Sequence, residues 1–165
     1  MGSAVATMAS SSFAACPAIT TLGLRSQAIV GATYTTANPL LDTYFAASKG
    51  TIASVAIGGG VTSVGAYAFY SAPALTTVTL ESGVTTVGDR SFMLCESLTD
   101  ITMASSVTTF VASPFQACSS LEQLTIPSGT TTIPAEFCHG CTSLQAIVIP
   151  DTVTTVASEA FKACT

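Results

Sequence analysis

Cysteine and histidine are the residues of this sequence best suited to redox or metal chemistry. They occur together once, in the segment Cys138-His139-Gly140-Cys141. A C-x-x-C spacing is typical of thiol–disulfide redox motifs and of zinc sites. A structural zinc site needs four ligands, usually from two such pairs, and the chain has no second histidine. We therefore favour a simpler interpretation, in which both cysteines are small buried apolar residues and neither a metal nor another cofactor is bound.

The six cysteines of the chain leave two alternatives open. Cys95, Cys118, Cys141 and Cys164 recur every 23 residues, and stacked repeats would place them about 5 Å apart, within the Cα range of a disulfide. Three disulfides are therefore conceivable. However, Ala72 occupies the same slot one repeat earlier, which indicates an inward apolar position. We favour free buried thiols.

No other group of residues points to catalysis. A Ser-His-Asp arrangement would have to use His139, which we expect to be an exposed turn residue. The nine acidic residues fall mostly in outward positions and favour solubility over acid–base chemistry. Gly58-Gly59-Gly60 lacks the lysine and the following helix of a phosphate-binding loop. The sequence therefore predicts that the protein is not an enzyme.

Charge and hydropathy exclude several partner classes. The formal net charge is −5, and the four basic residues are scattered along the chain. Nucleic-acid binding needs clustered lysine and arginine, so neither DNA nor RNA nor an anionic membrane is expected as a partner. No apolar run approaches the roughly 20 residues that span a bilayer, so no membrane insertion is expected. Met1 to Phe13 has no recognisable signal peptide.

A 23-residue repeat is the main signal in the sequence. Apolar residues keep this period in several independent columns, of which one is leucine, one is phenylalanine and one is cysteine. The unit reads V-x-x-V-x-x-x-x-F-x-x-C-x-x-L-x-x-V-x-L, followed by about three turn residues. The leucine column is Leu75, Leu98, Leu121 and Leu144, and the phenylalanine column is Phe69, Phe92, Phe115 and Phe161.

The repeats predict one domain over residues 1–165. Its units begin near residues 5, 28, 61, 84, 107, 130 and 153, and the last unit is partial. Ile19 and Ile52 are 33 apart, which places a ten-residue insertion within Ala28 to Leu40, expected as a surface loop. A single coil cannot bury its own apolar edge, so coils must stack. We predict a curved right-handed leucine-rich-repeat solenoid of about seven coils, with a parallel β-sheet on one side and irregular or short helical turns on the other.

Two segments carry a resemblance to a known family. "VTTVGDRSFMLCESLTDITM" and "CTSLQAIVIPDTVTTVASEAFKAC" resemble the BspA-like leucine-rich repeats of bacterial and protist surface proteins. The resemblance implies an extracellular or cell-surface adhesion or interaction protein, with no catalytic residues shared by the family. This chain departs from the pattern where Cys138 takes the phenylalanine slot with Phe137 one residue early. Phe45 is early in the same way, and Lys49 replaces the slot's cysteine.

Small hydroxyl side chains form regular rows on the predicted outward positions. Threonine suits a pleated surface, so β-propensity and solubility are one explanation. The other is a flat face that binds protein, glycan or even ice, with the binding residues Thr77, Thr79, Asp100, Thr102, Gln123 and Thr125. The terminal units have no polar cap, which predicts either a fragment of a longer array or a structural subunit that joins end to end into a filament or layer.

Overall fold

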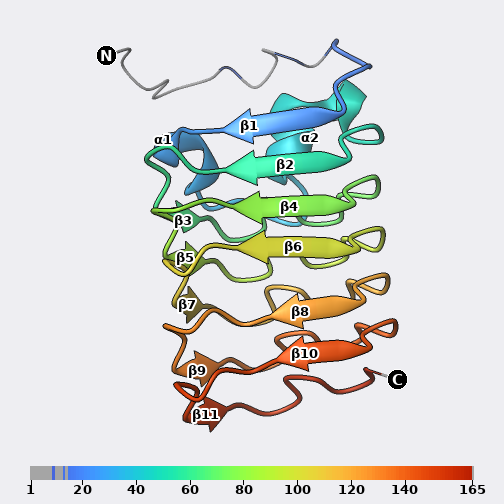
Figure 1. Ribbon diagram of the computed structural model, residues 1–165. Coiled ribbons are helices and arrows are strands. Elements are labelled where there is room, and N and C mark those ends of the chain that lie inside the picture. The colour runs from blue at the N-terminus through green and yellow to red at the C-terminus, as the bar shows by residue number, and fades with distance from the viewer. Residues whose placement is uncertain (1–8, 10–12, 14, 165) are drawn as a thin grey trace.

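The computed structural model describes residues 9, 13 and 15–164 and forms a parallel-sheet solenoid with little helix (Figure 1). Its main sheet has the strand order β1-β2-β4-β6, and the pair β8–β10 continues the same stack. The bounds of these strands are β1 Thr21–Leu24, β2 Ser54–Ile57, β4 Thr77–Leu80, β6 Asp100–Met103, β8 Gln123–Thr125 and β10 Ala146–Val148.

From β2 onward, each coil then turns into a second, shorter strand on another side of the solenoid, whereas β1 is followed by helix α1. Three of these strands form the sheet β3-β5-β7, and the last two form the pair β9–β11. Their bounds are β3 Ser63–Val64, β5 Thr86–Val87, β7 Thr109–Phe110, β9 Thr132–Ile133 and β11 Thr155–Val156. The helical elements are two short helices, α1 Gln27–Val30 and α2 Leu40–Tyr44, and the 3₁₀ helix η1 Ala46–Ser48. The predicted solenoid class is confirmed.

The register of the main sheet follows the repeat. Val78 pairs with Val55 on β2 and with Ile101 on β6, so successive partners are 23 residues apart. Between β1 and β2 the partners are Leu22 and Val55, which is one period plus ten. Because strand side chains alternate between the two faces, this register places every apolar slot of a strand inward.

Like side chains pack on like side chains inside the solenoid. Leu75, Leu98 and Leu121 are fully buried, and Leu144 packs partly buried against the same core. The aromatic rings form a second column, in which Phe92 lies 5.2 Å from Phe69 and 5.8 Å from Phe115 between ring centroids. Both columns are confirmed.

The aromatic column passes through Phe137 where the repeat has Cys138. The Phe137 ring is fully buried, 5.4 Å from Phe115 and 6.0 Å from Phe161. In the neighbouring coils the residue before the phenylalanine is Pro114 or Ala160, both buried. In this coil the large and the small residue have exchanged positions: Phe137 comes first and Cys138 second. The coil therefore still contributes one ring to the aromatic column. The rings meet edge-on here, whereas Phe92 and Phe115 are stacked.

The insertion differs in part from the surface loop expected within Ala28 to Leu40. Tyr34, Leu40 and Leu41 are buried, and the irregular segment continues through α2 and η1. The Tyr34 and Leu40 backbone N–H groups donate to the carbonyls of Ala66 and Ala68, both at 2.9 Å. Thr35 to Asn38 are exposed, as expected for a surface loop, whereas the residues on either side of them line the next coil and add to its core. The start of the first unit, with Val5 and Met8, lies outside the described residues.

The cysteines also differ in part from the prediction of free buried thiols. Cys138 and Cys141 are bonded to each other as a disulfide within one turn. The prediction was wrong for this pair because Cys138 stands where the other coils carry phenylalanine, three residues before the cysteine slot. Cys95 and Cys118 are free and buried as expected. Cys16 is free but exposed.

The free ladder thiols hydrogen-bond along the solenoid. Cys95 Sγ donates to the Phe69 carbonyl at 3.1 Å, and Cys118 Sγ donates to the Phe92 carbonyl at 3.2 Å. Cys141 Sγ lies 3.3 Å from the Phe115 carbonyl, but its bond to Cys138 leaves it no proton to donate. The cysteine slot is therefore both apolar and a link between coils.

From Tyr67 onward, two points of each coil have left-handed backbone. Side chains other than glycine rarely adopt this conformation, so its recurrence every 23 residues shows that the turn imposes it. The first point has φ between 48° and 57°, and its residues are Tyr67, Arg90, Ser113, Glu136 and Glu159. The second falls four residues later and includes Gly140 at φ 78°. Because the first point repeats in register, Glu136 and Glu159 lie on adjacent coils in one column.

Candidate functional site

The six residues predicted as a binding site lie on the outer face of β4, β6 and β8. Thr77 is partly exposed and the other five are exposed. The register pairs Thr77 with Asp100 and Thr79 with Thr102 on neighbouring hydrogen-bonded strands. Gln123 and Thr125 lie on the next strand of the stack, β8, which belongs to the separate pair β8–β10 (Figure 1). The outward placement is confirmed, and the binding role stays a prediction.

Hydroxyl groups in neighbouring rows serve the fold. Thr76 Oγ1 donates to the Ala53 carbonyl at 3.0 Å, and Thr85 Oγ1 donates to the Thr62 carbonyl at 3.0 Å, each reaching back one coil. Within the described part of the chain, Thr77, Thr79 and Thr125 make no side-chain hydrogen bond, and Thr102 Oγ1 donates only to Asp100 Oδ2 at 3.4 Å. The strand-face hydroxyls are therefore available to a partner, whereas the others hold coils together.

The glycine turn at Gly58 to Gly60 lies against the ion pair between Arg25 and Glu81. Arg25 donates to both carboxylate oxygens of Glu81, at 2.9 and 3.0 Å, and so links coils on either side of this turn. A Cβ atom on Gly58 would collide with the Glu81 side chain, and one on Gly59 with Arg25. The glycines therefore make room for a bridge between coils.

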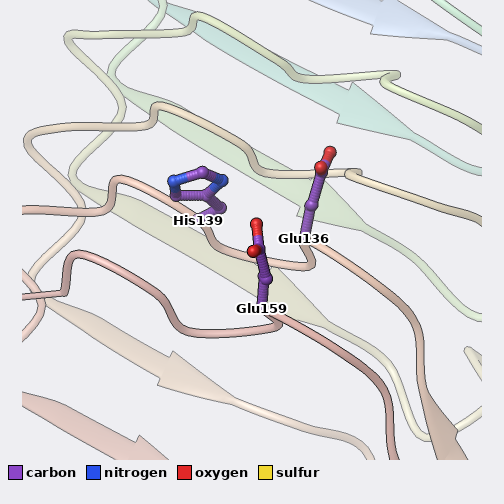
Figure 2. A group of neighbouring side chains, drawn as sticks. All are labelled: Glu136, His139 and Glu159. Carbon is purple, nitrogen blue, oxygen red and sulfur yellow. The ribbon is translucent and has the colours of Figure 1, made fainter.

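A second group of polar side chains gathers on the turns that carry the left-handed column. Glu136, His139 and Glu159 each offer a ligand atom, and these atoms all lie within 4.8 Å of one another (Figure 2). Glu136 and His139 belong to one coil, and Glu159 belongs to the next. We call these three residues the Glu-His-Glu group. An imidazole nitrogen and two carboxylates at this spacing could hold a metal ion.

Hydrogen bonds orient both carboxylates of the Glu-His-Glu group. Ser113 Oγ donates to Glu136 Oε2 at 2.9 Å, and Lys162 Nζ donates to Glu159 Oε1 at 3.0 Å. Each carboxylate thereby keeps a second oxygen that makes no hydrogen bond to the described residues. His139 is partly buried, and its Nδ1 atom is buried with no partner among those residues.

Sequence reasoning missed the Glu-His-Glu group. It treated Glu136 and Glu159 as solubilising acids and expected an exposed turn for His139, which is wrong because the ring is partly covered. The available signal was the period itself. Glu136 and Glu159 are 23 apart, and His139 follows Glu136 by three, as Lys162 follows Glu159. The C-x-x-C segment drew attention to the cysteines, although the histidine between them is the residue that meets the acids.

No helix formed by the described residues is long and apolar enough to cross a bilayer, and the longest of them, α2, has five residues.

Comparison with known proteins identifies the repeat. The family model described as "BspA type Leucine rich repeat region" matches residues 40–165 in six copies. A solved leucine-rich cell surface protein from Faecalibacterium prausnitzii is similar over 87% of this chain at 30% identity, with a TM-score of 0.65. The leucine-rich repeat protein of T. pallidum is similar over 72% at 28% identity, with a TM-score of 0.67.

Both of these solved proteins are longer than this chain, which covers 34% of the first and 56% of the second. No curated protein matches the sequence. The family match extends over more than half of the chain and agrees with the 23-residue register of the sheet. The chain therefore belongs to the BspA-type leucine-rich repeat family.

Proposed function

We propose that the chain is a non-catalytic, surface-type interaction module that binds protein or glycan through the outer face of β4, β6 and β8. The observation that carries this proposal is the row of exposed hydroxyl side chains at Thr79, Thr102 and Thr125, in which Thr102 alone donates to a described residue, Asp100 Oδ2 at 3.4 Å. Adjacent strands lie about 4.8 Å apart, so the row offers hydroxyl groups at a regular spacing. Each hydroxyl can donate and accept a hydrogen bond.

The composition of this face also suits a binding surface. The centres of protein interfaces are depleted of lysine, glutamate and aspartate, and the six residues of the face include only one of these, Asp100. Threonine loses less side-chain entropy on immobilisation than a long charged residue does. Family membership supports the same proposal, because the F. prausnitzii relative is itself a cell surface protein. We extend that location, extracellular or at the cell surface, to this chain.

The test is a screen of labelled protein against arrays of glycans and of immobilised proteins. Replacing Thr79, Thr102 and Thr125 together by lysine would put three charges on the face without touching the core. We expect every ligand of the native protein to be lost in this variant. The matched control replaces Thr108 and Thr131, which are exposed in a different row. Equal binding by the triple variant and the native protein would exclude this face.

A second candidate is a structural subunit that joins end to end with other copies. Two side chains in inward slots of the last coils, Ile149 and Val156, are 43% and 52% exposed, whereas Ile126 and Ile133 are 2% and 0% exposed in the same slots. Among the described strands, β10 pairs with β8 alone. Such an edge can pair with a strand of a second copy.

Light scattering of the purified protein over a range of concentrations tests this assembly. We expect a mass that grows with concentration, and a return to monomer when Ile149 and Val156 are both replaced by lysine. A strict monomer at high concentration would exclude end-to-end joining and leave the interaction module untouched.

A further inference from the structure

We propose that the Glu-His-Glu group is a binding site for one divalent transition-metal ion of the zinc class. The three ligand atoms lie within 4.8 Å of one another and converge from two adjacent coils (Figure 2). A tetrahedral ion with bonds of about 2.0–2.1 Å holds its ligands about 3.4 Å apart. To bind an ion, the distances between the three ligand atoms must therefore shorten by at most about 1.4 Å, which side-chain rotation can provide.

The backbone fixes where the ligands start. Glu136 and Glu159 both occupy the first left-handed point of their coils, with φ of 54° and 57°. Their Cβ atoms therefore leave the two turns in the same direction, one coil apart. His139 lies in the loop closed by the Cys138–Cys141 disulfide, in which Gly140 supplies the second left-handed point. A ligand carried by a covalently closed turn loses little conformational freedom when it binds an ion.

Two hydrogen bonds, one of them within an exposed ion pair, orient the carboxylates of the Glu-His-Glu group. Ser113 holds Oε2 of Glu136, and Lys162 holds Oε1 of Glu159. Outer groups of this kind orient ligating side chains and tune their affinity. Because each uses one oxygen, each carboxylate retains another oxygen for the ion.

His139 provides an independent indication of a ligand. Its Nδ1 atom is buried and has no hydrogen-bond partner in the described chain. A buried polar atom normally has a partner, and one without a partner lowers stability. An ion bound through Nδ1 would satisfy this nitrogen and draw both carboxylates toward the same point.

The donor set selects the class of ion. One imidazole nitrogen with two carboxylate oxygens suits zinc and neighbouring transition metals. Calcium prefers six to eight oxygen ligands, and magnesium prefers octahedral oxygen. Because Glu136 and Glu159 belong to consecutive coils, the ion would also tie the last coil to the one before it.

The test is calorimetric titration of tag-free protein with zinc chloride. It is done in a Cys16→Ser background, because Cys16 is an exposed free thiol that could bind zinc by itself. We expect one zinc ion per chain and a higher melting temperature with zinc, since an ion that binds the folded state stabilises it. Ser113→Ala should weaken binding by about 10–100-fold, and His139→Ala and Glu159→Gln by at least that much.

Glu122→Gln is the matched control, because it removes an exposed acid outside the group and should bind zinc like the parent protein. The visible spectrum with cobalt in place of zinc should show nitrogen and oxygen ligation without a thiolate charge-transfer band. The proposal is overturned by the absence of saturable zinc binding, or by undiminished affinity in either His139→Ala or Glu159→Gln. A thiolate band, or calcium binding as tight as zinc binding, would equally overturn it.

Discussion

Replacing Phe92 by alanine should remove much of the stability of the solenoid. The Phe92 ring is fully buried between Phe69, at 5.2 Å and 3° between planes, and Phe115, at 5.8 Å and 17°. Truncating a buried phenylalanine to alanine costs about 3–5 kcal/mol. Each aromatic pair contributes about 0.5–1.5 kcal/mol beyond its buried area. Because Phe92 makes two such pairs, we expect a loss near the top of the range, about 4–5 kcal/mol.

Urea unfolding followed by circular dichroism measures this loss. Phe92→Leu keeps much of the volume but removes both ring contacts, so it should cost about 1–2 kcal/mol. Val111→Ala is the control, because Val111 is 42% exposed and a surface change stays within about 0.5 kcal/mol. A loss below about 1 kcal/mol for Phe92→Ala would show that the rings do not form a packed column, and the reasoning would fail.

Three further changes probe the same architecture. Leu98→Ala should lower the free energy of unfolding by about 2–5 kcal/mol through the cavity it leaves, measured by the same urea titration. Burial raises the pKa of the Cys95 thiol to about 12 and that of Cys118 well above its usual value. In the unfolded chain these thiols ionise at about pH 8.5, whereas in the folded protein they stay protonated at that pH. The free energy of unfolding is therefore not reduced by thiol ionisation below about pH 8.5. It should fall above it by about 1.4 kcal/mol per pH unit for each thiol, and replacing both thiols by alanine should flatten the pH profile. Gly88→Ala would place a Cβ 2.5 Å from the Val64 carbonyl oxygen and should lower the melting temperature, whereas Gly23→Ala meets nothing within 4 Å and should leave it unchanged.

The parts of the fold that repeat could be predicted from the sequence. Val78 lies between Val55 and Ile101 because the same slot recurs in each coil, and a stacked chain must bring recurring slots together. The exposure of Thr79 and Thr102 follows from the same register, since alternate strand residues face outward. Periodicity therefore predicted the core and the outer face together.

The parts that break the period could not be predicted in the same way. Phe137 keeps the aromatic column continuous although it stands one position early, and only the packing shows that its ring reaches the core. No other coil contains the insertion, so the repeat could not predict its path. The burial of Tyr34 and Leu40 depends on tertiary contacts that only the structure shows.

The Glu-His-Glu group was missed for a related reason. The repeat brings equivalent positions of successive coils together, whatever residues occupy them. The members of this group are of different residue types, so they form no column of identical residues. Ser113, Glu136 and Glu159 share one slot, but a search for identical residues in a column does not find them. The path of the turn between the slots decides whether His139 meets these acids.

Methyl–methyl nuclear Overhauser contacts in protein with labelled valine, leucine and isoleucine test the stacking most directly. Adjacent coils should give contacts between Val55 and Val78 and between Val78 and Ile101, because these pairs are partners on strands about 4.8 Å apart. Val55 and Ile101, two coils apart, should give none. Contacts shifted by one or two residues from these pairs, or none between neighbouring coils, would contradict a solenoid held in 23-residue register.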